Sequence, residues 1–296
     1  ESLRGAKQAI VHVYNAISPA WRDIVFQMER SQVREIAVNA AKLLRDHAAA
    51  QPDTDWHFEY SPETFSTAEL DFSLECCEAV MDILRPTPER PLILNLPATV
   101  ECATPNIYAD QIEWICRNIS RRDSVVISLH THNDRGTGVA AAELGIMAGA
   151  DRVEGCLFGN GERTGNCNLT SVIPNLVLKM GRKSIPKANL KKLREMARFV
   201  DEVANLVPDR HQPWVGGTAF AHKGGMHVNA VQKVSQSFEH INLEAVGNWR
   251  RILVSDLAGR SNIVMKAQEM GIRISNDTPE LKDILAKVKK QEHLGY

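Results

Sequence analysis

The chain has 296 residues, of which 44% are hydrophobic and 24% are charged, with 18 glycines and 13 prolines. This composition excludes collagen-like, disordered and low-complexity proteins, and it fits one large globular domain or two ordinary ones. The 35 basic and 36 acidic side chains leave a net charge of -1. No overall field attracts nucleic acid or an anionic membrane, so we expect neither as a partner.

The cysteine content and the length of the apolar runs indicate the cellular compartment in which the protein is expected. Six cysteines without C-x-x-C spacing are too few for a disulfide framework and argue against a thiolate zinc site, which favours a reducing, cytoplasmic setting. The apolar runs are only a few residues long, and the amino-terminal stretch has no signal-peptide pattern. The chain opens at Glu1 and soon enters a buried-strand pattern, which predicts that it is an interior part of a longer protein.

Short apolar runs alternate with longer amphipathic stretches along the first two thirds of the chain. The pattern predicts strands at 9–13, 56–60, 92–96, 125–130 and 152–157, a weaker strand at 214–219, and helices at 30–47, 67–84, 107–119, 138–148 and 168–180. Consecutive βα units without a dinucleotide fingerprint favour an α/β fold of the (β/α)8 TIM-barrel type over a doubly wound sheet. Eight units close such a barrel, so the predicted barrel is incomplete.

After residue 181 the pattern changes to charged amphipathic helices. Helices are expected at 187–206, 263–270 and 279–290, with turn-rich segments between them. We therefore predict a partial (β/α) barrel catalytic domain at 1–221 and a C-terminal α-helical subdomain at 222–296.

The strongest local signal is the segment 128–134 (SLHTHND) at the end of a predicted strand. Residues two apart on a strand point the same way, so His130 and His132 present two imidazoles to one point. Imidazole suits zinc, manganese or iron, although histidines at a strand end also often bond only to their neighbours. Further ligands must come from elsewhere.

A glycine-rich loop, 159–166 (GNGERTGN), follows the next predicted strand. Glycines let the backbone approach a ligand, but such a loop is more often a tight turn, and it matches neither the Walker nor the Rossmann spacing. Its place one strand beyond the histidines makes Asn166 a candidate metal ligand or supporting partner.

Polar residues also follow the first three predicted strands. Because the carboxyl ends of barrel strands meet at one face, these side chains together predict a pocket for a small oxygen-rich substrate. They are His12 and Asn15, Ser61 and Glu63, and Asn95 and Thr99.

A last cluster lies at 219–227 (AFAHKGGMH). Its histidines suit metal ligands, a general base or solvated side chains at a helix entry, and the residues alone favour the last of these.

Several segments together resemble the 2-isopropylmalate synthase and citramalate synthase family. They are 96–101 (LPATVE), 130–136 (HTHNDRG) and the loop 159–166. Residues 2–166, including 60–63 (YSPE), look most like long-form 2-isopropylmalate synthases. The later segments 219–227 and 251–262 (RILVSDLAGRSN) look more like citramalate synthases.

The resemblance implies an acyltransferase that condenses acetyl-CoA with an α-keto acid at a divalent metal ion, which would be zinc, magnesium or manganese. It implies 2-ketoisovalerate as the substrate, in leucine biosynthesis, with pyruvate and citramalate synthesis as the alternative. By likeness, His130 and His132 are metal ligands with Asn166 close to the metal, and His12, Glu63, Asn95 and Thr99 line the keto-acid pocket. Glu63 and His227 are the catalytic candidates. His227 matches a histidine that family members deliver from the partner chain, which implies a homodimer with exchanged C-terminal subdomains.

One departure from the family leaves a second hypothesis open. The family's first strand ends in an Asp-x-Thr-Leu-Arg-Asp-Gly-type segment that supplies a carboxylate ligand, and nothing in this chain corresponds to it. The family's C-terminal regulatory domain has no counterpart either. The likeness then begins at about the third barrel strand, and we expect weaker metal binding than in a complete site, or a non-catalytic fragment. A metallohydrolase is a third possibility, but its paired histidines usually lie on the first strand.

Overall fold

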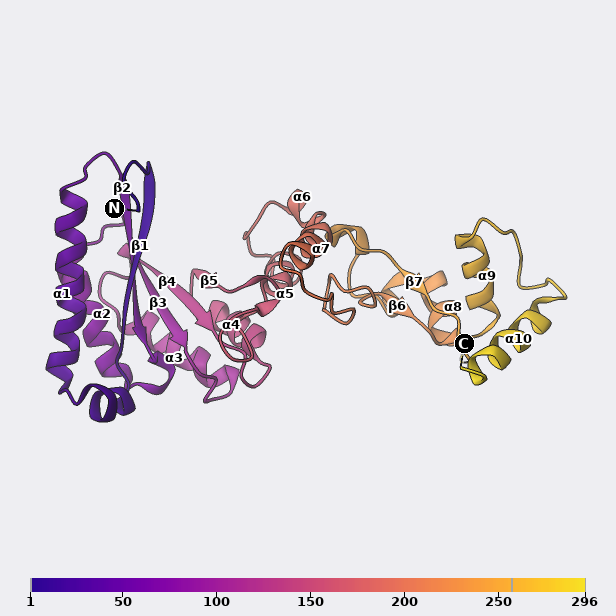
Figure 1. The fold of residues 1–296 in the computed structure, drawn as a ribbon, viewed down its shortest axis with the longest axis horizontal. Coiled ribbons are helices and arrows are strands. Elements are labelled where there is room, and N and C mark those ends of the chain that lie inside the picture. The colour runs from indigo at the N-terminus through magenta and orange to yellow at the C-terminus, as the bar shows by residue number, and fades with distance from the viewer. Residues whose placement is uncertain (1, 257, 296) are drawn as a thin grey trace. The chain divides into compact units, whose positions relative to one another are not determined.

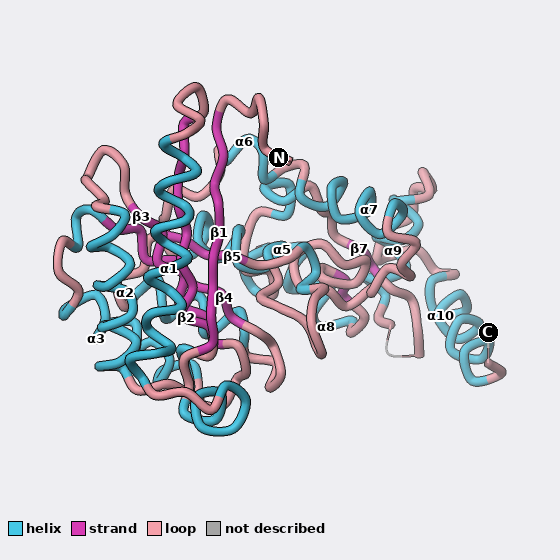
Figure 2. The backbone as a smooth tube through the Cα atoms, turned by 60° about the vertical axis from the view of Figure 1, so that its left-hand side comes forward, coloured by secondary structure: helices cyan, strands magenta, loops and turns pink. Residues whose placement is uncertain are grey.

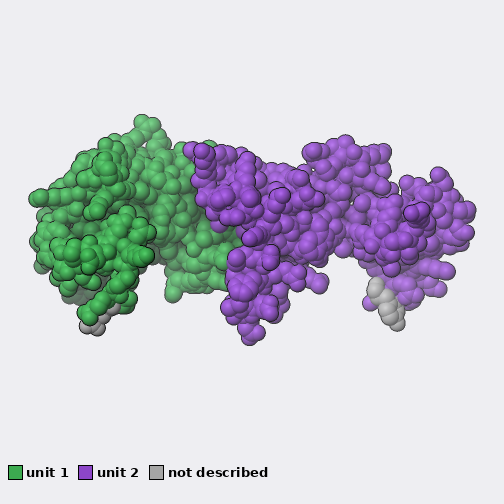
Figure 3. All heavy atoms as spheres, turned by 90° about the horizontal axis from the view of Figure 1, so that it is seen from above, with its two compact units in different colours: residues 1–172 green, residues 173–296 purple. Residues whose placement is uncertain are grey.

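The computed structural model describes residues 2–256 and 258–295. Leu257, within the segment likened to citramalate synthases, lies outside the described residues. The chain divides into two compact units, Glu1–Val172 (unit 1) and Ile173–Tyr296 (unit 2), which Figure 3 colours separately. The domain boundary expected at 221/222 stays a prediction. Among the described residues, no helix combines the length and the apolar character that crossing a membrane requires.

Unit 1 contains a parallel five-stranded sheet in the order β1-β2-β3-β4-β5. All five strands expected in this region are present, so the strand prediction from the short apolar runs is confirmed there. Within the described residues the sheet is open, with β1 and β5 at its edges. The strands are β1 (Gln8–Ala16), β2 (Asp55–Glu63), β3 (Leu92–Ala98), β4 (Val125–Thr131) and β5 (Arg152–Glu154).

Helices connect the strands and lie side by side along the sheet (Figures 1 and 2). Helix α1 begins after a capping box between Glu29 and Gln32, and α3 begins with a proline, whose fixed φ suits a first turn. The α-helices of unit 1 are α1 (Arg30–Ala49), α2 (Leu70–Leu84), α3 (Pro105–Asn118) and α4 (Gly138–Met147), with α5 (Leu169–Pro174) at the unit boundary. The described part of the unit also contains a π-helix, η1 (Trp21–Phe26), and the 3₁₀ helices η2 (Phe65–Thr67), η3 (Arg122–Ser124) and η4 (Leu157–Gly159).

Alternation along the strands separates an apolar side from a polar side. On β4, Ile127 and Leu129 are fully buried, and Leu129 packs so closely on α4 that a methyl group at Gly145 would lie 2.5 Å from its Cδ1 atom. The intervening residues Ser128 and His130 point the other way, and the register places them opposite Arg152 and Glu154 of β5. We call this second side the inner face.

Unit 2 is mainly helical, as expected, with one small parallel pair of strands. The strand predicted at 214–219 is wrong: these residues form turns, in which Trp214 has a positive φ of 67° and the Gly216 amide bonds back to the Gln212 carbonyl at 3.0 Å. The elements are η5 (Asn175–Lys179), α6 (Lys187–Leu190), α7 (Leu193–Val203), β6 (Ala221–His222), α8 (Gly225–Lys233), η6 (Ser235–Ser237), η7 (Leu243–Val246), β7 (Arg251–Ile252), α9 (Arg260–Glu269) and α10 (Leu281–His293).

Candidate functional site

His130 and His132 point to the same place at the carboxyl end of β4. Their ring centroids are 5.2 Å apart. The side-chain Nδ2 of Asn166 lies 3.1 Å from His130 Nε2 and 3.4 Å from His132 Nε2. The backbone of Asn166 forms an isolated bridge with His132, which fixes the loop against the strand end. The structure therefore brings together the three residues that the sequence singled out as metal ligands.

The glycines of the loop leave the space in which the Asn166 side chain lies. A Cβ atom on Gly161 would stand 1.7 Å from Asn166 Oδ1, so any side chain there would displace the amide. Gly165 has a φ of +109°, and a Cβ atom there would lie 1.9 Å from the carbonyl oxygen of Gly159. The same carbonyl accepts a hydrogen bond from the Asn166 amide at 2.7 Å. The glycine spacing thus reflects the placement of one asparagine.

His132 is held by an arginine. Arg163 Nη2 lies 3.1 Å from His132 Nδ1, and its guanidinium also donates to Asp134 at 2.6 Å. The hydrogen bonds from Arg163 lower the pKa of Asp134 to about 2. Burial first, and then the charges of His130 and Arg163, lower the pKa of His132, which favours its neutral form. Since arginine cannot accept, Nδ1 of His132 must, and the ring proton then lies on Nε2.

His130 is held by a carboxylate. Its Nδ1 lies 3.0 Å from Oε2 of Glu154, whose other oxygen accepts from Arg152 at 2.6 Å. Glu59, only 4% exposed, lies behind this pair, 3.6 Å from Arg152 and within hydrogen-bonding reach of Glu154. Burial and the neighbouring Glu154 raise the pKa of Glu59. Burial alone would raise the pKa of Glu154, but its hydrogen bonds to His130 and Glu59 and the charge of Arg152 lower it.

Sequence reasoning missed this group of three charged residues. The available signal was a charge at alternate positions inside strands that otherwise read as buried: Glu59 in 56–60 (WHFEY), and Arg152 and Glu154 in 152–154 (RVE). A charge in a buried strand needs a partner, so such positions deserve a place among site candidates.

A second polar chain crosses the inner face from β1 to β3. His12 Nε2 lies 2.7 Å from Ser61 Oγ, and Asn95 Nδ2 donates to the same oxygen at 3.0 Å. The other amide atom, Asn95 Oδ1, is buried without a hydrogen-bond partner, so it is available to a donor on a ligand. Asn15 lies on the opposite side, where it contacts the Val33 carbonyl of α1.

Glu63 and Thr99 lie at the ends of β2 and β3. Burial alone raises the pKa of the half-buried Glu63, which brings its carboxyl group closer to the range of a useful base. The Thr99 hydroxyl accepts from the backbone amide of Thr64 at 3.0 Å and keeps its own proton for another acceptor.

The remaining candidate, His227, belongs to unit 2. It is exposed on α8 and stacks on Phe238, with ring centroids 4.1 Å apart. Its neighbour in the sequence cluster, His222, is buried and lies 3.1 Å from Glu239, so it has a structural partner. The role expected for His227 stays a prediction.

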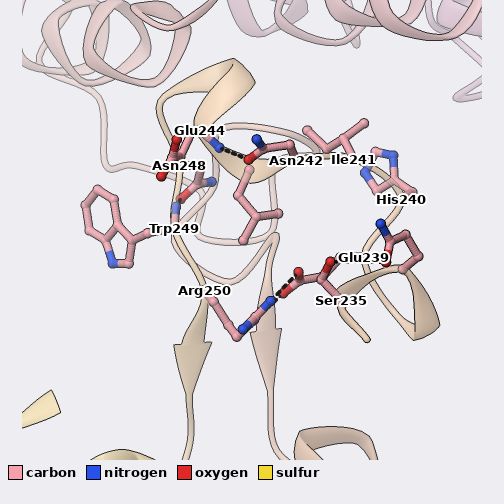
Figure 4. Close-up of a pocket in the computed structure, with 11 residues that line it drawn as sticks. Ser235, Glu239, His240, Ile241, Asn242, Glu244, Asn248, Trp249 and Arg250 are labelled. Carbon is pink, nitrogen blue, oxygen red and sulfur yellow. Dashed lines mark hydrogen bonds and ion pairs between the residues drawn. The ribbon is translucent and has the colours of Figure 1, made fainter. Parts of the chain in front are cut away.

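Unit 2 also contains a cavity of about 720 Å³, shown in Figure 4. Arg250 makes two hydrogen bonds to Glu239, at 2.6 and 2.7 Å, and Glu239 also contacts His222. These three charged or ionisable groups satisfy one another. The residues that chemistry singles out therefore remain those of unit 1.

The donors at the end of β4 fit a divalent cation. Two imidazole nitrogens converge with an amide, which would ligate zinc or manganese only after turning its oxygen in place of Nδ2 towards the cation, and open positions would remain for a chelating substrate. His132 can ligate through Nε2 only when Arg163 releases Nδ1. Among the described residues, no cluster of three or more His, Cys, Asp or Glu is placed to hold a metal ion.

Comparisons with known proteins agree with the expected fold and family. The 2-isopropylmalate synthases of Pseudomonas fluorescens (strain Pf0-1) and Pseudomonas savastanoi pv. phaseolicola (strain 1448A / Race 6) are 58% and 59% identical to this chain over 233 residues, which are 79% of this chain and 41% of each relative. The chain thus spans about two fifths of the length of the curated relatives it matches.

Comparison with solved structures also supports the expected fold. An HMG-CoA lyase structure from Bacillus subtilis superposes with a TM-score of 0.52 at 20% identity, and the match covers 70% of this chain and 67% of that one. One family model, described as homocitrate synthase post-HMGL domain-like, matches residues 214–294. A second, described as HMGL-like, matches residues 1–200, which confirms the TIM-barrel type of α/β fold. With that match covering more than half of its length, the chain belongs to the HMGL-like family.

Proposed function

We propose that this chain carries the metal-dependent condensing site of a 2-isopropylmalate synthase, an acyltransferase that joins acetyl-CoA to 2-ketoisovalerate in leucine biosynthesis. The observation that carries the proposal is the convergence of His130, His132 and Asn166 at one strand end. The 58% identity to a 2-isopropylmalate synthase supports the choice of reaction.

A divalent ion held by these three residues would supply a Lewis acid that polarises the carbonyl of the keto acid. The polar chain of His12, Ser61 and Asn95 binds and orients the keto acid on the inner face, with the unpaired Asn95 Oδ1 as an acceptor for a donor on the ligand. Glu63, as a half-buried carboxylate, takes a proton from the methyl group of the thioester. The resulting enolate forms a bond to the keto carbon, whose oxygen becomes an alkoxide and takes up a proton. Water then hydrolyses the thioester, and the release of CoA drives the reaction forward.

We infer that His227 acts from a partner chain, in a cytoplasmic homodimer that exchanges its C-terminal subdomains, with residues 1–221 as the catalytic part. The exposed position of His227 on α8 supports this role, since it leaves the ring free to approach another chain.

The test measures CoA release with acetyl-CoA and either 2-ketoisovalerate or pyruvate. Two proteins are compared: this chain, and a full-length relative in which the matching region is replaced by this chain. We expect release by the hybrid with 2-ketoisovalerate, and its loss in His132→Ala. Faster turnover of pyruvate would favour a citramalate synthase, which the segment 251–262 resembles. A folded hybrid that releases no CoA with either acid would favour a non-catalytic chain.

A further inference from the structure

We propose that Glu154 is a positioning residue for His130: it fixes the ring proton on Nδ1 and so keeps the Nε2 lone pair directed at the point where Asn166 and His132 converge. This inference rests on the proposed cation site, which it deepens by assigning different roles to the two histidines.

The sheet register places Glu154 beside His130. The two residues are paired across β4 and β5, and both side chains extend onto the inner face. Oε2 of Glu154 lies 3.0 Å from Nδ1 of His130, and Oε1 lies 2.6 Å from Nη1 of Arg152. The same Arg152 nitrogen donates to Ser128 Oγ at 2.9 Å. The carboxylate is therefore anchored on one oxygen while the other faces the ring.

The contact decides which ring nitrogen has a free lone pair. A carboxylate that already accepts from an arginine can only accept from the imidazole as well, so Nδ1 of His130 must donate. A neutral imidazole carries one ring proton, and Nε2 is then left with its lone pair facing Asn166 Nδ2, a donor at 3.1 Å. Partners of this kind fix the orientation of metal-ligating histidines in general.

His132 has the opposite tautomer to His130. Its Nδ1 faces Arg163, a group that can only donate, at 3.1 Å, and its ring proton therefore lies on Nε2. The longer contact of 3.4 Å between Asn166 Nδ2 and His132 Nε2 agrees with two donors facing each other. His130 is thus prepared to ligate a cation, whereas His132 must first exchange its proton and lose its contact with Arg163.

The experiment reads the two tautomers directly in the metal-free protein. Long-range proton–nitrogen spectra of the full chain, with ¹⁵N-labelled histidine, are recorded well above the usual imidazole pKa of about 6.5. His130→Asn and His132→Asn assign the signals. We expect the proton of His130 on Nδ1 and that of His132 on Nε2. In Glu154→Ala the proton of His130 should move to Nε2. In Glu154→Gln it should move as well, because the single amide oxygen stays with Arg152 and the amide nitrogen then donates to Nδ1.

Titration calorimetry with Zn²⁺ and Mn²⁺ supplies the second measurement. Glu154→Ala and Glu154→Gln should each weaken binding about 10- to 100-fold, and the surface variant Glu113→Ala should bind like the wild type. A wild-type His130 with its proton on Nε2, or a Glu154→Ala variant with an unchanged His130 tautomer, overturns the inference. If Glu154→Ala does not fold, the wild-type spectrum and Glu154→Gln decide. If the two histidines have the expected tautomers but the protein binds neither metal, the proposed cation site is wrong, whereas the positioning role of Glu154 is supported.

Discussion

Replacing Gly161 by alanine should displace Asn166 from the two histidines. The added Cβ atom would lie 1.7 Å from Asn166 Oδ1 and 2.8 Å from its Cγ, whereas ordinary contacts begin near about 3.4 Å. The amide must therefore shift by roughly 1.5 Å. The backbone cannot follow easily, because the Asn166 amide bonds to Gly159 at 2.7 Å and the residue bridges to His132. The side chain has to leave its position between the imidazoles.

A displacement of this size has large effects on a site built from three converging groups. Misplacing a functional group by about 1 Å can cost on the order of 100-fold in activity, and losing a supporting partner costs about 10- to 100-fold in metal affinity. We therefore expect Gly161→Ala to bind Mn²⁺ at least about tenfold more weakly than the wild type. The global stability should fall by only about 1 kcal/mol, the worth of a hydrogen bond lost in a surface loop.

Calorimetry and the side-chain amide resonances of Asn166 measure this effect. Asn160→Ala is the matched control, because Asn160 is the exposed neighbour of Gly161 in the same loop. It should leave both readouts unchanged. Wild-type Mn²⁺ affinity together with unshifted Asn166 resonances in Gly161→Ala would refute the claim that the glycine makes room for the amide.

Two further predictions concern the stability of unit 1. The buried Arg22 donates to both oxygens of Glu69 and lowers the pKa of Glu69 from its usual 4.5 to about 2. Such a shift is worth roughly 3 kcal/mol. We reduce this figure to about 1–2 kcal/mol because 35% of the Glu69 side chain is exposed. A carboxylate with a lowered pKa stabilises the fold fully above pH 4.5, and this stabilisation is lost as the pH falls towards 2. In urea unfolding, Glu69→Gln should therefore be about 1–2 kcal/mol less stable than the wild type at pH 7 and equally stable near pH 2. Gly145→Ala gains up to about 1 kcal/mol of helix propensity. It also forces a methyl group to within 2.5 Å of the fully buried Leu129, which costs about 1–3 kcal/mol, so urea unfolding should find the variant less stable than the wild type. A stabilised variant would contradict the close packing of α4 on β4.

Periodicity was enough to predict the sheet of unit 1 and the end of the strand where the site lies. Buried strands alternating with amphipathic helices leave few topologies, and parallel strands bring their carboxyl ends to one edge. For the same reason the convergence of His130 and His132 follows from their spacing alone. The segment 214–219 misled because its apolar residues resemble a strand, while Pro213, Gly216 and Gly217 direct the backbone into turns.

The partners of the histidines could not be predicted in this way. Glu154 lies 24 positions from His130 in the sequence, and only the register of β4 against β5 shows that the two side chains meet, with Arg152 holding the carboxylate of Glu154. Glu59 comes from a strand farther away still, on β2. Such contacts depend on strand order and register, which one sequence without relatives does not reveal.

The two histidines look equivalent in the sequence, and the structure makes them different. Strand geometry decides where each ring points, but the group behind the ring decides which nitrogen keeps the proton. A carboxylate stands behind His130 and a guanidinium behind His132, at 3.0 and 3.1 Å. Because a neutral imidazole ligates only through its unprotonated nitrogen, spacing alone identifies a pair of candidate ligands, and the charge of each partner determines which of the two is ready to bind.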